Sequence, residues 1–220
     1  AQLSNQGQLH NRALARARDL MFAELQHRVS NNLATVSALL RLQSARVSSP
    51  DAKQALVASM QRLNTVARIQ RSLYSPDAQE IEVDSFLSQL AADTRDSFAM
   101  DAVAEIEIRA EKFRLVSDQA IPFGLIASEM IMNALEHARP SEGPLHIEIA
   151  CHISPAAPPS VRLRITDNGA GLPPETGAAK SLGVSIAQQF ARTLGGSLTI
   201  TNRQDRPGVA AELQFPLATL

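Results

Sequence analysis

The run that decides the fold lies in the middle of the chain and reads Ser128-Glu129-Met130-Ile131-Met132-Asn133-Ala134-Leu135-Glu136-His137-Ala138. Glu129, Asn133 and His137 fall at positions i, i+4 and i+8 of a helix, so they share one polar face. The rest of the run is too apolar for a helix that lies free on the surface. The pattern predicts a helix over about 120–138 whose polar face lines a cleft.

Short β-patterned runs surround this helix, and two further helical patterns lie among them. The strands are expected at residues 81–84, 104–109, 145–152, 161–166, 197–201 and 209–215, and the two helices at 85–100 and 183–194. Strands gathered into a sheet with helices on one face form a two-layer sandwich. We therefore expect an α+β domain over residues 79–220.

The first part of the chain has a different pattern, because it reads as two long helices over residues 4–47 and 50–74. Ser49 can cap the second helix, and Pro50 suits its first position. Two long helices joined by a short loop form an antiparallel hairpin, here expected over residues 1–78. Such a hairpin leaves an apolar stripe half covered, so it should pair with a second copy or with another domain.

One histidine lies on the polar side of the first helix. His27 points about half a turn away from the apolar stripe, with Glu24 and Asn31 one turn to either side. An imidazole that faces water between a carboxylate and an amide suits a group that must meet another molecule. Most exposed histidines, however, have no such role.

Composition excludes several classes of function. The net charge is −1, aromatic residues make up 4% of the chain and tryptophan is absent, which argues against a nucleic-acid footprint and a membrane-interface belt. No apolar run reaches about 18 residues, so no transmembrane helix is expected in this stretch. The single cysteine, Cys151, allows no internal disulfide and favours a reducing cytoplasm. Because the chain opens on Ala1 and a helical pattern, we expect the C-terminal part of a longer protein, which could itself be membrane-anchored.

Four segments together resemble a known family. The run His27-Arg28-x-x-Asn31-Asn32-Leu33 resembles the dimerisation and phosphoacceptor segment of the HisKA_2 histidine kinases, close to the HWE kinases. The segments 128–138, 167–173 and 181–184 resemble the N, G1 and G2 boxes of a GHKL (Bergerat) ATP-binding domain. They cover most of residues 15–220 in the family's order and spacing. The resemblance implies a helical hairpin followed by a GHKL-type sandwich.

The resemblance also implies ATP and Mg²⁺ as cofactors and roles for the residues of the boxes. Asn133 would bind Mg²⁺ through its side-chain oxygen, and Glu129 would orient a water or ligand in the metal's shell, with His137 on the same face. Asp167 would accept a hydrogen bond from the exocyclic amine of adenine. Gly169 and Gly171 would let the backbone turn and approach the nucleotide closely.

The residues after the G1 box would contact the phosphates. Residues 174–180 would form a short lid, from which Lys180 could supply a positive charge. Ser181, Leu182 and Gly183 begin a helix, whose free N–H groups and positive end suit an anion.

The chain departs from the family's pattern in two places. Glu136 stands where these kinases often carry a lysine, which removes a possible phosphate contact and leaves the source of positive charge open. Pro207-Gly208-Val209 stands where the family often shows Gly-Thr, so a hydroxyl contact near the adenine pocket is lost. Both departures could lower the affinity for ATP.

In the predicted reaction a nitrogen of His27 attacks the γ-phosphorus of ATP. Glu24 would hold the other ring N–H, Arg28 would steady the phosphoryl charge, and Asn31 could position a water against an acyl phosphate on a partner. The last role predicts phosphatase activity towards that partner.

The sequence thus predicts the cytoplasmic kinase core of a sensor histidine kinase. Residues 1–78 would dimerise and carry His27, residues 79–220 would bind ATP, and the phosphoryl group would pass to an aspartate of a response regulator receiver domain. One alternative is a phosphotransfer protein or response-regulator phosphatase with a degenerate ATP-binding domain. Another is a purely structural hairpin joined to an ATP-driven switch, as in GHKL ATPases. No contact with nucleic acid or with a membrane is expected within this fragment.

Overall fold

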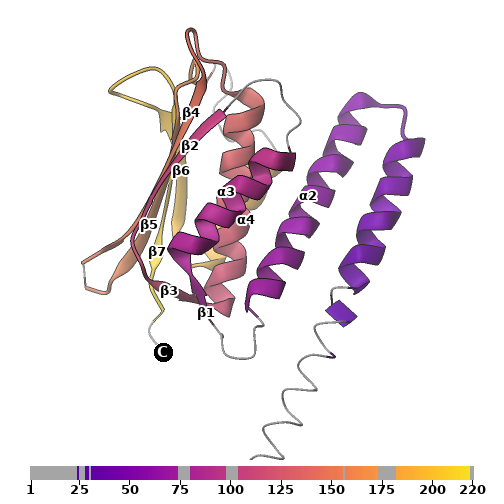
Figure 1. The fold of residues 1–220 in the computed structure, drawn as a ribbon, viewed down its shortest axis with the longest axis horizontal. Coiled ribbons are helices and arrows are strands. Elements are labelled where there is room, and N and C mark those ends of the chain that lie inside the picture. The colour runs from indigo at the N-terminus through magenta and orange to yellow at the C-terminus, as the bar shows by residue number, and fades with distance from the viewer. Residues whose placement is uncertain are drawn as a thin grey trace, which may run out of the picture. The chain divides into compact units, whose positions relative to one another are not determined.

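The computed structural model describes residue 24 and residues 28–29, 31–73, 80–97, 104–155, 157–172 and 182–218. The chain divides into two compact units, Ala1–Gln79 and Glu80–Leu220. Figure 1 shows the helices of the first unit and the sheet and helices of the second. Among the described residues, no helix is both long enough and apolar enough to cross a membrane.

The first unit contains a helical hairpin, as predicted. Residues 31–46 form one helix, and α2 (Pro50–Leu73) follows after a short link. Ser49 caps α2, because its hydroxyl accepts the N–H of Ala52 at 3.4 Å and its carbonyl accepts the N–H of Lys53 at 3.0 Å. The part of the first predicted helix that precedes residue 24 lies outside the described residues.

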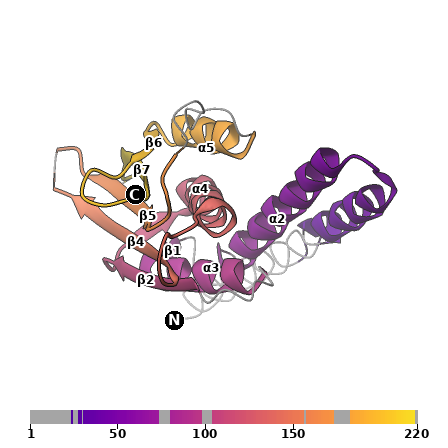
Figure 2. The same ribbon diagram turned by 90° about the horizontal axis from the view of Figure 1, so that it is seen from above.

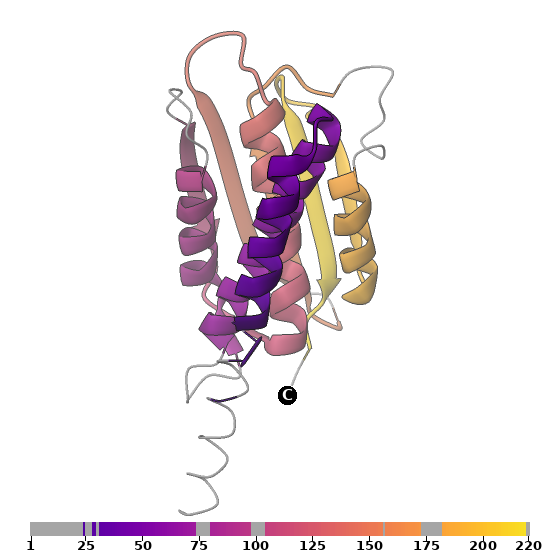
Figure 3. The same cartoon turned by 90° about the vertical axis from the view of Figure 1, so that its right-hand side faces the viewer.

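The second unit is a two-layer α+β sandwich, as predicted. Its five-stranded sheet has the order β2-β4-β5-β7-β6, in which only β2 and β4 are parallel. The strands are β2 (Ala104–Ala110), β4 (Leu145–Ser154), β5 (Ser160–Asp167), β6 (Ser197–Asn202) and β7 (Val209–Pro216). The helices α3 (Val83–Ser97), α4 (Ser117–His137) and α5 (Leu182–Thr193) cover one face of this sheet (Figures 2 and 3).

The core lies between the sheet and α4, which runs between α3 and α5 (Figure 2). Alternate residues of the strands point into this layer, and Ile149, Leu163 and Phe215 are almost completely buried. Phe123 of α4 is fully buried, and its ring centroid lies 6.1 Å from that of Phe215. Burial of each such side chain contributes about 1.5–3 kcal/mol. The packing therefore fixes α4 against the middle of the sheet.

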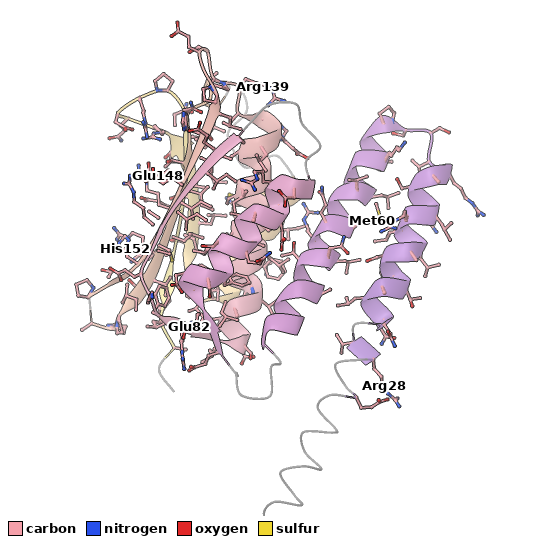
Figure 4. All side chains as sticks on the ribbon, in the orientation of Figure 1. Arg28, Met60, Glu82, Arg139, Glu148 and His152 are labelled. Carbon is pink, nitrogen blue, oxygen red and sulfur yellow. The ribbon has the colours of Figure 1, made fainter. Side chains whose placement is uncertain are left out.

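The other face of the sheet is polar. Figure 4 shows Glu148 and His152 of β4 on the side away from the helices. Arg109 bridges Glu107 and Glu148 there, at 2.8 Å and 3.2 Å. Cys151, the neighbour of His152, points the opposite way and is buried as predicted, and burial raises the pKa of its thiol to about 12.

One element differs from the sequence prediction. The short strand β3 (Arg114–Val116) was not predicted, and α4 begins directly after it at Ser117, ahead of the predicted start at about residue 120. β3 pairs with β1 (Glu80–Glu82), and the partner of Ile81 is Leu115, which is fully buried. A strand of three residues is too short to show an alternating pattern, so only its tertiary contacts reveal it.

Candidate functional site

A buried carboxylate lies at the end of β5. Asp167 is 6% exposed, and its Oδ1 accepts the backbone N–H groups of Gly169 at 2.8 Å and Val209 at 3.2 Å. None of the described residues donates a hydrogen bond to Oδ2. Burial raises the pKa of this carboxyl, while the two N–H groups and Arg203 oppose that rise. Asp167 is thus a fixed acceptor with one oxygen available to a ligand.

The turn after Asp167 packs directly on the end of α4. A side chain at Gly169 would lie 2.9 Å from Cα and Cβ of Ala138 and 3.0 Å from the nitrogen of Arg139, so only glycine fits this contact. The contact sets the end of β5 against the last turn of α4. It therefore brings residues 167–173 beside the helix that contains residues 128–138.

The other end of the same turn is held by β6. Gly171 has a φ of +91°, and the N–H of the next residue, Leu172, donates to Oδ1 of Asn202 at 2.6 Å. Asn168, which lies between Asp167 and Gly169, has a structural role. Its amide donates to the carbonyl of Pro144 at 3.1 Å and accepts the N–H of His146 at 2.8 Å.

The predicted polar face of α4 contains both half-buried and exposed residues. Glu129 and Asn133 are half-buried, and His137 is exposed at the end of the helix. Asn133 lies little more than one turn before Ala138, where the Gly169 turn packs. Glu136 is half-buried, with its Oε2 3.7 Å from Nε2 of His137. The structure thus brings Asn133 and His137 to the end of α4 that faces the Asp167 turn.

Some predicted phosphate contacts cannot be placed. Lys180 and Ser181, and with them residues 174–180 of the expected lid, lie outside the described residues. Leu182 is the first residue of α5, and Gly183 is buried in the first turn. The N-terminal end of a helix carries a partial positive charge, so this end suits an anion.

Sequence reasoning missed the part that the β6–β7 connection plays. Arg203 donates to the backbone carbonyl of Asp167 at 3.3 Å, and the N–H of Val209 supplies one of the bonds to the Asp167 carboxylate. The valine that replaces a threonine of the family's pattern therefore still contacts the site through its backbone. The sequence pointed to this connection only through Pro207-Gly208-Val209, because backbone donors and distant arginines leave no local pattern.

Near the expected phosphoacceptor, two of the predicted residues form an ion pair. Arg28 donates through Nε to Glu24 at 2.8 Å, and both side chains are exposed. The exposed Asn31 uses its carbonyl to accept the Thr35 hydroxyl at 2.9 Å. His27 lies outside the described residues. Figure 4 shows Arg28 before the start of the helix of residues 31–46, and Arg139 just beyond the end of α4.

The donor set suits a cation held together with a ligand. Within the described ranges there is no group of three or more histidine, cysteine or acidic residues that could hold a metal ion. Mg²⁺ takes one or two protein oxygens and completes its shell with water and substrate phosphates. Asn133 can supply such an oxygen, so the site fits Mg²⁺ only alongside a phosphate ligand.

This sandwich, with a buried aspartate followed by a glycine turn against the central helix, defines the GHKL class of ATP-binding domains. Residues 118–219 match the family of histidine kinase-, DNA gyrase B- and HSP90-like ATPases, and residues 24–98 match the histidine kinase family HisKA_2. The chain belongs to the histidine kinases of the HisKA_2 class. The second match begins within α4, and the first extends past Gln79 to include α3.

Named relatives agree with this class. The chain is 30% identical over 210 residues to the sensor histidine kinase PdtaS of Mycobacterium tuberculosis, covering 91% of this chain and 40% of the relative. It is 25% identical over 209 residues to blue-light-activated histidine kinase 2 of Erythrobacter litoralis, covering 91% and 58%. The chain therefore spans only part of these proteins.

A solved structure supports the fold. The histidine kinase domain of the Erythrobacter litoralis blue-light activated histidine kinase superposes with a TM-score of 0.63 at 24% identity. The superposition covers 93% of this chain and 94% of that one.

Proposed function

We propose that this chain is the kinase core of a sensor histidine kinase, in which residues 79–220 bind ATP and residues 1–78 present His27 to it. The observation that carries the proposal is the Asp167 carboxylate. It is buried, two backbone N–H groups hold its Oδ1, and no described residue donates to its Oδ2. An ionised carboxylate only accepts hydrogen bonds, so this oxygen suits a ligand amine such as that of adenine.

The phosphates would lie between the ends of α4 and α5. Asn133 would bind Mg²⁺ together with phosphate oxygens and water, and Glu129 would orient a water of that shell. His137 lies on the same polar face of α4 as Glu129 and Asn133. Lys180, Ser181 and the first two residues of α5, Leu182 and Gly183, would contact the phosphates.

A further positive charge is available at the end of α4. Arg139 is exposed, follows the helix cap, and has its backbone nitrogen against the Gly169 turn. Its Nη1 donates to the carbonyl of Ala138 at 2.9 Å. Arg139 is therefore our candidate for the positive charge that is lost where Glu136 stands in place of the family's lysine.

Phosphoryl transfer depends on alignment and charge neutralisation more than on covalent chemistry from the protein. A nitrogen of His27 forms a bond to the γ-phosphorus, the bond to the β–γ bridging oxygen breaks, and ADP leaves. Glu24 would hold the second ring nitrogen, and Arg28, which already pairs with Glu24, would face the transferred group. The phosphoryl group then moves to a carboxylate of a response regulator receiver domain, where Asn31 would direct a hydrolytic water.

The hairpin would also form a homodimer. Large apolar side chains of its first helix stay exposed, Leu39 by 57% and Leu42 by 62%. Such a stripe is typical of a helix that packs against another copy. The use of ATP and the buried thiol of Cys151 fit a cytoplasmic location.

One observation favours a second function. The half-buried Glu136 adds negative charge beside His137, next to the expected phosphates. Weak ATP binding would leave a phosphotransfer protein or a response-regulator phosphatase, with His27 and Asn31 as its working residues.

Incubation with γ-labelled ATP and Mg²⁺ distinguishes these functions. The kinase predicts an acid-labile label, mapped to His27 and absent from His27→Gln. No label, together with faster dephosphorylation of a phosphorylated receiver domain, supports the second function. Steady ATP hydrolysis that His27→Gln leaves unchanged would instead indicate a GHKL-type ATPase switch.

A further inference from the structure

The connection between β6 and β7 is held closed by one buried arginine. Arg203 donates from Nε and Nη2 to the two carboxylate oxygens of Asp205, at 3.1 Å and 2.8 Å. Its remaining Nη1 donates to the backbone carbonyl of Asp167 at 3.3 Å. The Arg203 side chain is 6% exposed, whereas that of Asp205 is 61% exposed. This arrangement, called here the Arg203 clamp, joins the connection to the end of β5.

The backbone of the connection depends on the same residues. The N–H of Arg203 donates to the carbonyl of Gly208 at 3.0 Å, which closes the loop. Gly208 has a φ of +133°, and a side chain there would collide with the carbonyl oxygen of Asp167 and lie 3.1 Å from Cδ of Arg203. The stem of Arg203 therefore packs over Gly208, and Gly208 packs on the backbone of Asp167.

The closed connection determines where β7 begins. Its first residue, Val209, pairs with Asn202 and donates one of the two bonds that hold Oδ1 of Asp167. Asp167 is thus held at its carbonyl by Arg203 and at its carboxylate by the residue that follows Gly208. Movement of the connection would release both contacts at once.

We propose that Arg203 is a positioning residue for recognition of the nucleotide base. By holding the β6–β7 connection on the carbonyl of Asp167, it keeps the Val209 N–H on Oδ1 and leaves Oδ2 directed at the base amine. The inference rests on the proposed function, because Asp167 must first be the residue that reads the base.

The chemistry of the clamp requires arginine. A guanidinium presents several N–H donors in one rigid plane and contacts two oxygens of Asp205 and a third on Asp167 at once. A lysine ammonium is a single point charge on a flexible stem and cannot hold this geometry. Arg203 lowers the pKa of Asp205 to about 2, so the pair stays ionised at neutral pH.

Nucleotide binding by this chain tests the inference. ADP and inosine diphosphate each compete with a fluorescent nucleotide for the site. The two are compared because inosine carries a carbonyl where adenine has its amine. The wild type should prefer ADP, and Asp167→Asn should lose that preference. Arg203→Ala and Arg203→Lys should weaken ADP binding about tenfold, with little change for inosine diphosphate. Arg164→Ala is the matched control, because this exposed arginine pairs with Glu212 elsewhere on the sheet.

Each outcome decides a separate point. If the Arg203 variants melt cooperatively and keep the wild-type preference for ADP, the inference is wrong while the nucleotide site stands. A wild type without ADP binding, or an Asp167→Asn variant with unchanged preference, refutes the site itself and the inference with it. Should both Arg203 variants fail to fold, the preference for ADP is measured on Asp205→Asn, which removes the ion pair and leaves Arg203 in place. A weaker preference supports the inference, and an unchanged preference overturns it.

Discussion

The buried Asp167 should make the domain less stable than it would be with an amide at the same position. In Asp167→Asn, Oδ1 still accepts the N–H groups of Gly169 and Val209, but an NH₂ group replaces Oδ2. The NH₂ group of the asparagine and the exocyclic NH₂ group of adenine, both donors, would then face each other. Hydrogen bonds to charged groups contribute about 1.5–3 kcal/mol, so the dissociation constant for ADP should rise about 10- to 100-fold.

While the substitution weakens ADP binding, it should increase the stability of the folded domain. Burial raises the pKa of Asp167 in the folded chain above its ordinary value of 3.8. The folded state therefore holds this proton more tightly than the unfolded state. Stability falls as the pH rises from the unfolded pKa through the folded pKa and stays lower above it. The asparagine variant escapes this loss, so it should be more stable than the wild type at pH 7 and lose that advantage in acid.

Urea unfolding across pH 3–8, together with ADP titrations at pH 7, measures both effects on the same samples. Glu212→Gln is the matched control, because Glu212 is an exposed carboxylate on the neighbouring strand β7. An Asp167→Asn variant that is less stable than the wild type at pH 7, or that binds ADP normally, would contradict this reasoning. Asp167 would then not be a buried carboxylate that costs stability and accepts a hydrogen bond from the ligand.

Three further results are expected. Gly169→Ala forces a methyl group against the backbone of Ala138, so it should lower the free energy of urea unfolding by about 1–3 kcal/mol and weaken ADP binding; unchanged values would contradict the close packing. Glu136→Lys restores a cation beside the expected phosphates and should tighten ATP binding severalfold, by fluorescence titration, without altering the preference for adenine over hypoxanthine. Cys151, with its pKa raised to about 12, should not react with a thiol reagent at pH 8 until denaturant is added, and rapid labelling of the folded chain would refute its burial.

Local patterns predicted what depends on local spacing. The polar face of α4 follows from a helical repeat, the glycine turn after β5 from its composition, and the start of α2 from Ser49 and Pro50. These features need only a few neighbouring residues to be recognised. The fold class followed because the patterned segments occur in the order of a known family.

The details of the candidate site depend on contacts between distant parts of the chain. The donors from Val209 and Arg203 reach Asp167 across the sheet, and Val209 acts through a backbone N–H that any residue but proline carries. Asn202 holds the G1 turn from another strand, because its side-chain Oδ1 accepts the N–H of Leu172. No repeat or spacing predicts such contacts. The role of His27 stays a prediction.

The strand order has a consequence for when the domain becomes competent. Asp167 ends β5, yet one of its two fixed donors is the first residue of β7, which joins the sheet between β5 and β6. A nascent chain halted after α5 would contain every box of the family's pattern and still lack the second of the two donors that hold the Asp167 carboxylate. The proposed nucleotide site would therefore stay incomplete until β6 and β7 have joined the sheet, and chains truncated before β7 should bind ADP weakly.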